Sequence, residues 1–203
     1  LEEPPPKSVL ILLSTEPRRM LETILSRCLR LNFSGGGRRE LNSAETEWLE
    51  KFGALAAAEQ KSLLTRYRLL DALLQKLGEI RAQTDESLAA RSPLEKYGDV
   101  EKDLREKWEN ELAAAVEAEY RRRRADLLLL VQFWLRDIWL RTLAAGGELL
   151  NFPKISGTEI VAKKISPRQA RENLQTLEQT QQWLHTNVQE SLALEVGLLK
   201  LHF

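Results

Sequence analysis

The amino-acid sequence predicts a mainly α fold: a helical bundle with one unusually long helix pair, preceded by a small α/β segment. Three observations lead to this prediction. Apolar residues recur at helical spacing through most of the chain after residue 42. Residues 100 to about 143 are typical of one very long helix, or of two helices with a bend. Residues 1–33 instead contain two short runs of the kind found in strands, of which the first is apolar throughout.

The first 33 residues are predicted to form a strand, a helix and a second strand. Residues 9–13 and 29–33 are the expected strands, and the helix between them covers about residues 17–25, with Thr15 as its N-cap. This order is typical of a piece of a parallel α/β domain. Because the first run is apolar at every position, we expect that strand to be covered on both faces.

Residues 34–42 form the expected linker, since they include three consecutive glycines. A helical domain then covers residues 43–203. Asn42 or Ser43 is placed to cap its first helix. The apolar positions of the first two helices predict one buried stripe on each: Trp48, Phe52 and Leu55 on the first, and Leu63, Tyr67, Leu70, Leu74 and Leu77 on the second.

The long helix has two halves of different character. We expect residues from about 93 to 124 to form a highly charged helical insertion. At a spacing of four residues its sequence pairs Glu101 with Arg105, Asp103 with Lys107, Glu117 with Arg121 and Glu119 with Arg123. Residues 121–124 are four successive arginines, which we expect to lie on a solvated face. The second half is apolar nearly all round and should be buried, and Gly146 and Gly147 should end the helix.

Capping signals predict where the last two helices begin. Ser166 and Gln169 form a capping box, with Pro167 at the first helical position. Asn187 and Glu190 have the same spacing and predict the start of the final helix. That helix should place Leu192, Val196 and Leu199 on its buried face.

Composition excludes several classes of function. Lys plus Arg and Asp plus Glu are equal, at 30 each, so the formal net charge is zero and no general polyanion-binding surface is indicated. The single cysteine, Cys28, excludes a disulfide framework, and His185 and His202 are too few to suggest a metal site. We expect a cytoplasmic protein without a membrane span. The three glycines are followed by Arg38 and Arg39, so no phosphate-binding loop is recognised.

Three short motifs at the N-terminus carry a family resemblance. The segments L-E-E-P-P at residues 1–5, S-T-E-P at residues 14–17 and T-I-L-S-R-C at residues 23–28 occur in order. Together they resemble the clamp-loader subunits of bacterial DNA polymerase III, of the delta-prime or gamma/tau kind, which are AAA+ ATPases. In that family the first motif precedes the strand that carries the sensor-1 residue, and S-R-C carries an arginine finger. The resemblance implies that Thr15 is sensor-1-like and that Arg27 is the finger, acting in trans in the intact complex.

A weaker resemblance extends to the C-terminal part. Residues 132–137, Q-F-W-L-R-D, resemble the family's collar helix, and residues 187–195 resemble its final helix, with Gln189 and Ser191 in place of the usual Asn and Arg. Residues 34–86 are too few for the family's three-helix lid and the first collar helix, so we expect the lid to be missing or reduced. Residues 1–33 would then be the C-terminal remnant of an AAA+ ATPase domain.

The resemblance implies a structural role for this chain. Its helical domain would assemble with other clamp-loader subunits, and the complex would act on the sliding clamp and primed DNA with ATP and Mg²⁺, while this chain has no cofactor and no ATPase activity of its own. The apolar run at residues 9–13 also predicts that residues 1–33 either pack onto the helical body or pair with a second copy of the chain, which would give a homodimer. One alternative is an unrelated all-helical adaptor that binds a partner through its tryptophan-bearing faces. Another is an ATPase subunit whose catalytic half precedes Leu1, and the delta-prime and gamma/tau types are not separated.

Overall fold

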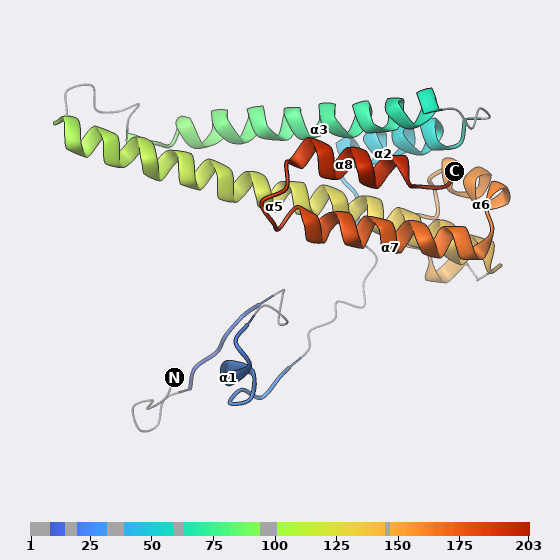
Figure 1. Ribbon diagram of the computed structural model, residues 1–203, viewed down its shortest axis with the longest axis horizontal. Coiled ribbons are helices and arrows are strands. Elements are labelled where there is room, and N and C mark those ends of the chain that lie inside the picture. The colour runs from blue at the N-terminus through green and yellow to red at the C-terminus, as the bar shows by residue number, and fades with distance from the viewer. Residues whose placement is uncertain (1–8, 15–19, 32–38, 59–62, 94–100, 145–146) are drawn as a thin grey trace. The chain divides into compact units, whose positions relative to one another are not determined.

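The chain folds into two compact units, Leu1–Gly37 and Arg38–Phe203, in a computed structural model that describes residues 9–14, 20–31, 39–58, 63–93, 101–144 and 147–203. The described part of the first unit contains a single helix, α1 (Glu22–Leu25). The second unit is a bundle of helices (Figure 1). Its described elements are α2 (Ser43–Ala56), α3 (Leu63–Ala89), α5 (Lys102–Thr142), the short 3-10 helix η2 (Gly147–Leu149), α6 (Gly157–Lys164), α7 (Pro167–Trp183) and α8 (Glu190–Leu199).

The α/β character expected of the first unit is absent from its described residues. Residues 9–13 and residues 29–31 lie outside any strand. A strand gains its hydrogen bonds only from a neighbouring strand, and the described residues provide none. Of the helix expected over residues 17–25, the described part is residues 20–25, in which α1 begins at Glu22 after the N-cap residue Leu21, which makes no side-chain capping bond. The proposed cap, Thr15, lies outside the described residues.

The long helix expected over residues 100–143 is confirmed as one continuous helix. α5 has 41 residues, which corresponds to a length of about 61 Å. Its second half is buried as expected, with Trp134 and Ile138 fully inaccessible, and its first half is exposed apart from scattered positions. α5 ends at Thr142, before the two glycines that were expected to end it, and Ala144 takes the left-handed conformation with φ of 54°.

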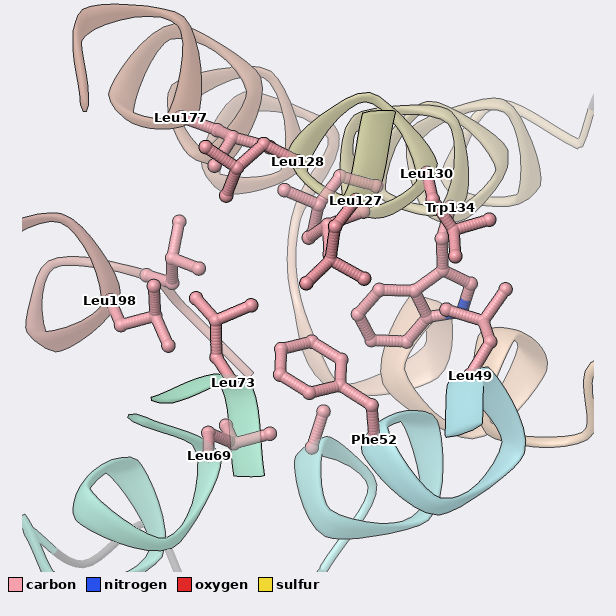
Figure 2. Close-up of a cluster of buried hydrophobic side chains, with 14 of the residues drawn as sticks. Leu49, Phe52, Leu69, Leu73, Leu127, Leu128, Leu130, Trp134, Leu177 and Leu198 are labelled. Atoms are coloured by element: carbon pink, nitrogen blue, oxygen red, sulfur yellow. The ribbon is translucent and has the colours of Figure 1, made fainter. Parts of the chain in front are cut away.

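The core of the bundle forms where α2, α3, α5, α7 and α8 meet. Figure 2 shows Leu49 and Phe52 of α2 beside Trp134 of α5, and the rings of Phe52 and Trp134 meet edge to face with centroids 5.7 Å apart. Trp134 also donates its indole N–H to Thr158 Oγ1 in α6 at 3.0 Å. Burial of each such large apolar side chain contributes on the order of 1.5–3 kcal/mol, so this cluster is the main source of the bundle's stability.

Two of the expected buried faces are shifted in the structure. On α3, the expected burial of Leu70 and Leu77 is confirmed, but Leu63 and Tyr67 are exposed, and the helix also buries Leu69, Leu73 and Ile80. This face is wider than the expected stripe because α2, α5 and α8 all pack against α3. On α8, Leu192 is 51 % exposed, and the helix buries Ala193, Leu194, Gly197 and Leu198. Gly197 explains that rotation, since a Cβ there would lie 2.2 Å from Thr180 Oγ1 of α7.

Two capping predictions are confirmed and one is wrong. Asn42 and Glu45 form a complete capping box at α2, and Ser166 and Gln169 form one at α7 with Pro167 in its first turn. α8 begins at Glu190 after Gln189, without a side-chain cap. Asn187 does not cap it because the Glu190 carboxylate, which would complete the box, instead accepts hydrogen bonds from α5.

Candidate functional site

The S-R-C motif lies in the turn that ends α1. The Ser26 N–H donates to Glu22 O at 2.8 Å, the Arg27 N–H donates to Ile24 O at 3.1 Å, and the Ser26 hydroxyl donates to Thr23 O at 3.2 Å. These bonds satisfy the last carbonyls of the short helix and fix the backbone of the turn. Arg27 and Cys28 follow with exposed side chains.

Of the two expected site residues, only Arg27 lies within the described residues. Thr15 lies outside the described residues, so its relation to Arg27 is not defined. Within the described residues, no group of three His, Cys, Asp or Glu side chains could hold a metal ion. None of the described helices is long and apolar enough to cross a membrane.

The segment that resembles a collar helix, residues 132–137, builds the core of the bundle. Besides Trp134, it contains Asp137, whose carboxylate is completely buried. Asp137 accepts three hydrogen bonds from the loop after η2: from the Asn151 N–H at 2.8 Å, the Asn151 Nδ2 at 3.1 Å and the Phe152 N–H at 2.6 Å. A buried carboxylate is tolerated because these donors replace water. Asp137 therefore fixes the loop that leads from α5 to α6.

A second polar cluster connects three helices and was missed by the sequence analysis. Arg124 of α5 is 8 % exposed, forms an ion pair with Glu190 at the start of α8 and donates to Leu184 O at the end of α7 at 3.2 Å. Tyr120, one turn earlier, also donates its hydroxyl to Glu190. Burial and this hydrogen bond raise the pKa of Tyr120 well above its ordinary value. The cluster fixes the register of α7 and α8 along α5.

The expectation that residues 121–124 lie on a solvated face is therefore half wrong. Arg121 and Arg122 are exposed and pair with Glu117 and Glu119 on their own helix. Arg123 reaches across to α3, where it donates to Thr84 Oγ1 at 3.1 Å, so the expected Glu119–Arg123 pair does not form. Only Arg121 follows the pairing that was predicted. Nearer the start of α5, Arg105 pairs with Glu109 and Lys107 with Glu111, so the carboxylate partner is C-terminal to each cation instead of N-terminal.

Comparison with known proteins identifies only the N-terminal segment. Residues 1–36 match the family model described as DNA polymerase III, delta subunit. The match supports a relation to DNA polymerase III clamp-loader subunits. It includes the L-E-E-P-P and S-R-C motifs and ends at the boundary of the helical bundle. No curated protein and no solved structure matches the chain.

Proposed function

We propose that this chain, which has no ATP site of its own, is the assembly-forming part of a delta-prime-like subunit of a DNA polymerase III clamp loader. The match of residues 1–36 carries the proposal, because that segment contains the motif in which clamp-loader subunits hold an arginine finger. The helical bundle would join other clamp-loader subunits, and ATP and Mg²⁺ would be bound by those subunits. The assembled complex would act on the sliding clamp and primed DNA in the cytoplasm.

Arg27 is the residue that we propose takes part in catalysis. In phosphoryl transfer the transition state spreads negative charge over the equatorial oxygens of the γ-phosphoryl group, and a guanidinium supplied by a neighbouring subunit stabilises that charge, a contribution of roughly 10³ to 10⁵ in rate. Such a residue needs no phosphate-binding loop on its own chain. The exposure of Arg27 in a hydrogen-bonded turn supports this role, since a finger must reach a second subunit.

Reconstitution with the ATP-binding clamp-loader subunits of the same organism tests the assembly role. The purified 203-residue chain should form a stoichiometric complex with them on size-exclusion chromatography. Failure to form any complex would remove the assembly role. Isothermal calorimetry with ATP and Mg²⁺ should give no binding heat for this chain alone, and micromolar binding would contradict its non-catalytic character.

The role of Arg27 is tested in the subunit that carries this chain, within the reconstituted complex. Arg27→Ala should leave assembly intact and strongly reduce DNA-stimulated ATP hydrolysis at the site next to it. Arg30→Ala is the matched control, because Arg30 is an exposed arginine three residues further along the same segment. Equal rates for the two variants would exclude Arg27 from the mechanism, whereas loss of the complex would show a role in assembly instead.

A further inference from the structure

Two helices of the bundle extend beyond the others and form an arm. We define the arm as residues 81–89 of α3 and 102–119 of α5, which continue past the ends of α7 and α8 (Figure 1). The α5 part has a length of about 27 Å at 1.5 Å per residue. In the body of the bundle, α7 and α8 cover the pair. On the arm, no described helix does so.

An open groove of about 450 Å³ runs between the two helices of the arm. Both helices contribute apolar and charged side chains to its lining. The lining consists of Arg81, Asp85 and Ala89 of α3 and Glu109, Leu112, Ala113, Val116 and Glu117 of α5. A groove lined along two neighbouring helices, with Ala89, Leu112, Ala113 and Val116 as its apolar residues, suits the apolar face of another helix.

The groove continues the line along which α8 packs. α8 runs antiparallel to α3: Arg66 donates to Leu199 O, and the Tyr67 hydroxyl donates to Glu195 at 3.0 Å. The other end of α8, Glu190, accepts from Tyr120. The ring of Tyr120 in turn lies 4.4 Å from the guanidinium of Arg81, the first groove residue of α3. A second helix placed in the groove would therefore extend the path of α8 along the same face.

The charges of the groove favour a basic occupant. Its lining contains three carboxylates and one guanidinium. Glu117 is paired with Arg81 and Arg121, and Glu109 is paired with Arg105. Among the described residues, Asp85 has no ion-pair partner. A helix flanked by Lys or Arg would neutralise Asp85.

We propose that the arm binds an amphipathic helix of a partner protein, with small apolar residues against Ala113 and basic residues beside Asp85. The partner helix lies in line with α8 and completes the helix packing that α7 and α8 provide in the body. This inference rests on the arm alone and is independent of the clamp-loader role.

Two fluorescein-labelled 18-residue synthetic helices test the proposal by fluorescence anisotropy with the 203-residue chain. They share one stripe of Ala and Leu and differ only in their flanks, which are Lys in one peptide and Glu in the other. The Lys peptide should bind about tenfold or more tightly than the Glu peptide, and added salt should reduce the difference. Absence of binding by both peptides, or equal binding, would overturn the proposal.

Three variants locate the binding site. Ala113→Arg fills the groove and should abolish binding of the Lys peptide. Ala114→Arg is the matched control, because Ala114 is the next exposed residue of α5 but does not line the groove, and binding should be unchanged. Asp85→Lys should reverse the preference between the peptides. Circular dichroism checks that each variant remains helical. If Ala113→Arg and Ala114→Arg act alike, or if sedimentation shows a dimer that Ala113→Arg dissociates, the occupant is not a partner helix in this groove.

Discussion

Arg124 and Glu190 form an ion pair that fixes the first residue of α8 against the middle of α5. Their contact also includes the end of α7, because Arg124 donates to Leu184 O. A single arginine therefore sets the positions of two helices relative to a third. The bundle depends on this pair more than on the many exposed ion pairs of α5, which are screened by water.

Replacement of Arg124 should lower the free energy of unfolding. Loss of one partner from a buried pair costs about 3–5 kcal/mol, but the Glu190 side chain is 32 % exposed, so about 2 kcal/mol is expected for Arg124→Met. Arg121→Met is the control, since Arg121 pairs with Glu117 on the surface and should cost less than about 0.5 kcal/mol. Urea denaturation measures both. In a double-mutant cycle, Glu190→Gln should cost less in the Arg124→Met background than alone. Simple additivity would show that the pair contributes nothing.

The raised pKa of Tyr120 predicts a loss of stability at alkaline pH. Below about pH 10 the phenol is protonated in both states, and its full contribution is present. As the pH rises above that value, the unfolded chain releases the proton first, so unfolding becomes more favourable by up to about 1.4 kcal/mol per pH unit until the folded-state pKa is passed.

Urea denaturation at about pH 9 and pH 11 measures this effect, since the drop in unfolding free energy should be smaller for Tyr120→Phe than for the wild type. Tyr67→Phe is the control, because Tyr67 bonds Glu195 at the surface and should change the pH dependence less. The same drop in unfolding free energy for all three proteins would show that Tyr120 does not cause the pH dependence.

Replacement by alanine should change the stability of the bundle in opposite directions at two of its glycines. At Gly197 a Cβ would lie 2.2 Å from Thr180 Oγ1, whereas at Gly78 in α3 it would meet nothing within 4 Å. Gly197→Ala should therefore destabilise the bundle by about 1–3 kcal/mol through overpacking. Gly78→Ala should stabilise it by roughly 0.5–1 kcal/mol through helix propensity. Thermal denaturation measures both, and Thr180→Ala should recover part of the loss in Gly197→Ala. A stabilising Gly197→Ala would disprove the close approach of α7 and α8.

Asp137 should be essential for the loop between α5 and α6. Asp137→Ala leaves the N–H groups of Asn151 and Phe152 without their acceptor in a buried site, which should cost about 3 kcal/mol. Glu106→Ala on the exposed half of α5 is the control and should change stability by less than about 0.5 kcal/mol. Hydrogen exchange at the Phe152 amide gives a local check. Retained protection of that amide in Asp137→Ala would show that the loop does not depend on the carboxylate.

The elements that the sequence predicts well are those with a local cause. α5 follows from uninterrupted helical spacing, and the caps of α2 and α7 follow from pairs of residues three positions apart. Contacts between distant segments are not visible in such patterns. The buried face of α8 depends on Gly197 meeting Thr180, and Asn187 fails as a cap because Glu190 bonds α5.

The candidate site is less predictable than the fold, for a related reason. The S-R-C motif locates Arg27 from sequence alone, but nothing local distinguishes Arg124 from the exposed arginines beside it. Asp137 offered a signal, since it is a lone carboxylate within an apolar run, and such a group must find buried donors. Strand predictions for residues 9–13 failed in the described structure because pairing partners are not encoded in the segment itself.

The exposed apolar run at residues 9–13 predicts association of the chain. Val9, Ile11 and Leu13 are 86 %, 79 % and 90 % exposed, and burial of each would contribute about 1.5–3 kcal/mol. In an extended conformation, the unpaired N–H and C=O groups of such a segment would also be a template for another chain. We therefore expect a dimer formed through this segment, or its docking on the helical body.

Sedimentation of the chain with and without residues 1–33 separates these outcomes from a monomer. Ile11→Lys should weaken a dimer, whereas Leu64→Lys, at an exposed position of α3, should not. If every form is a monomer of equal stability, the apolar run neither pairs nor docks, and the argument from burial fails.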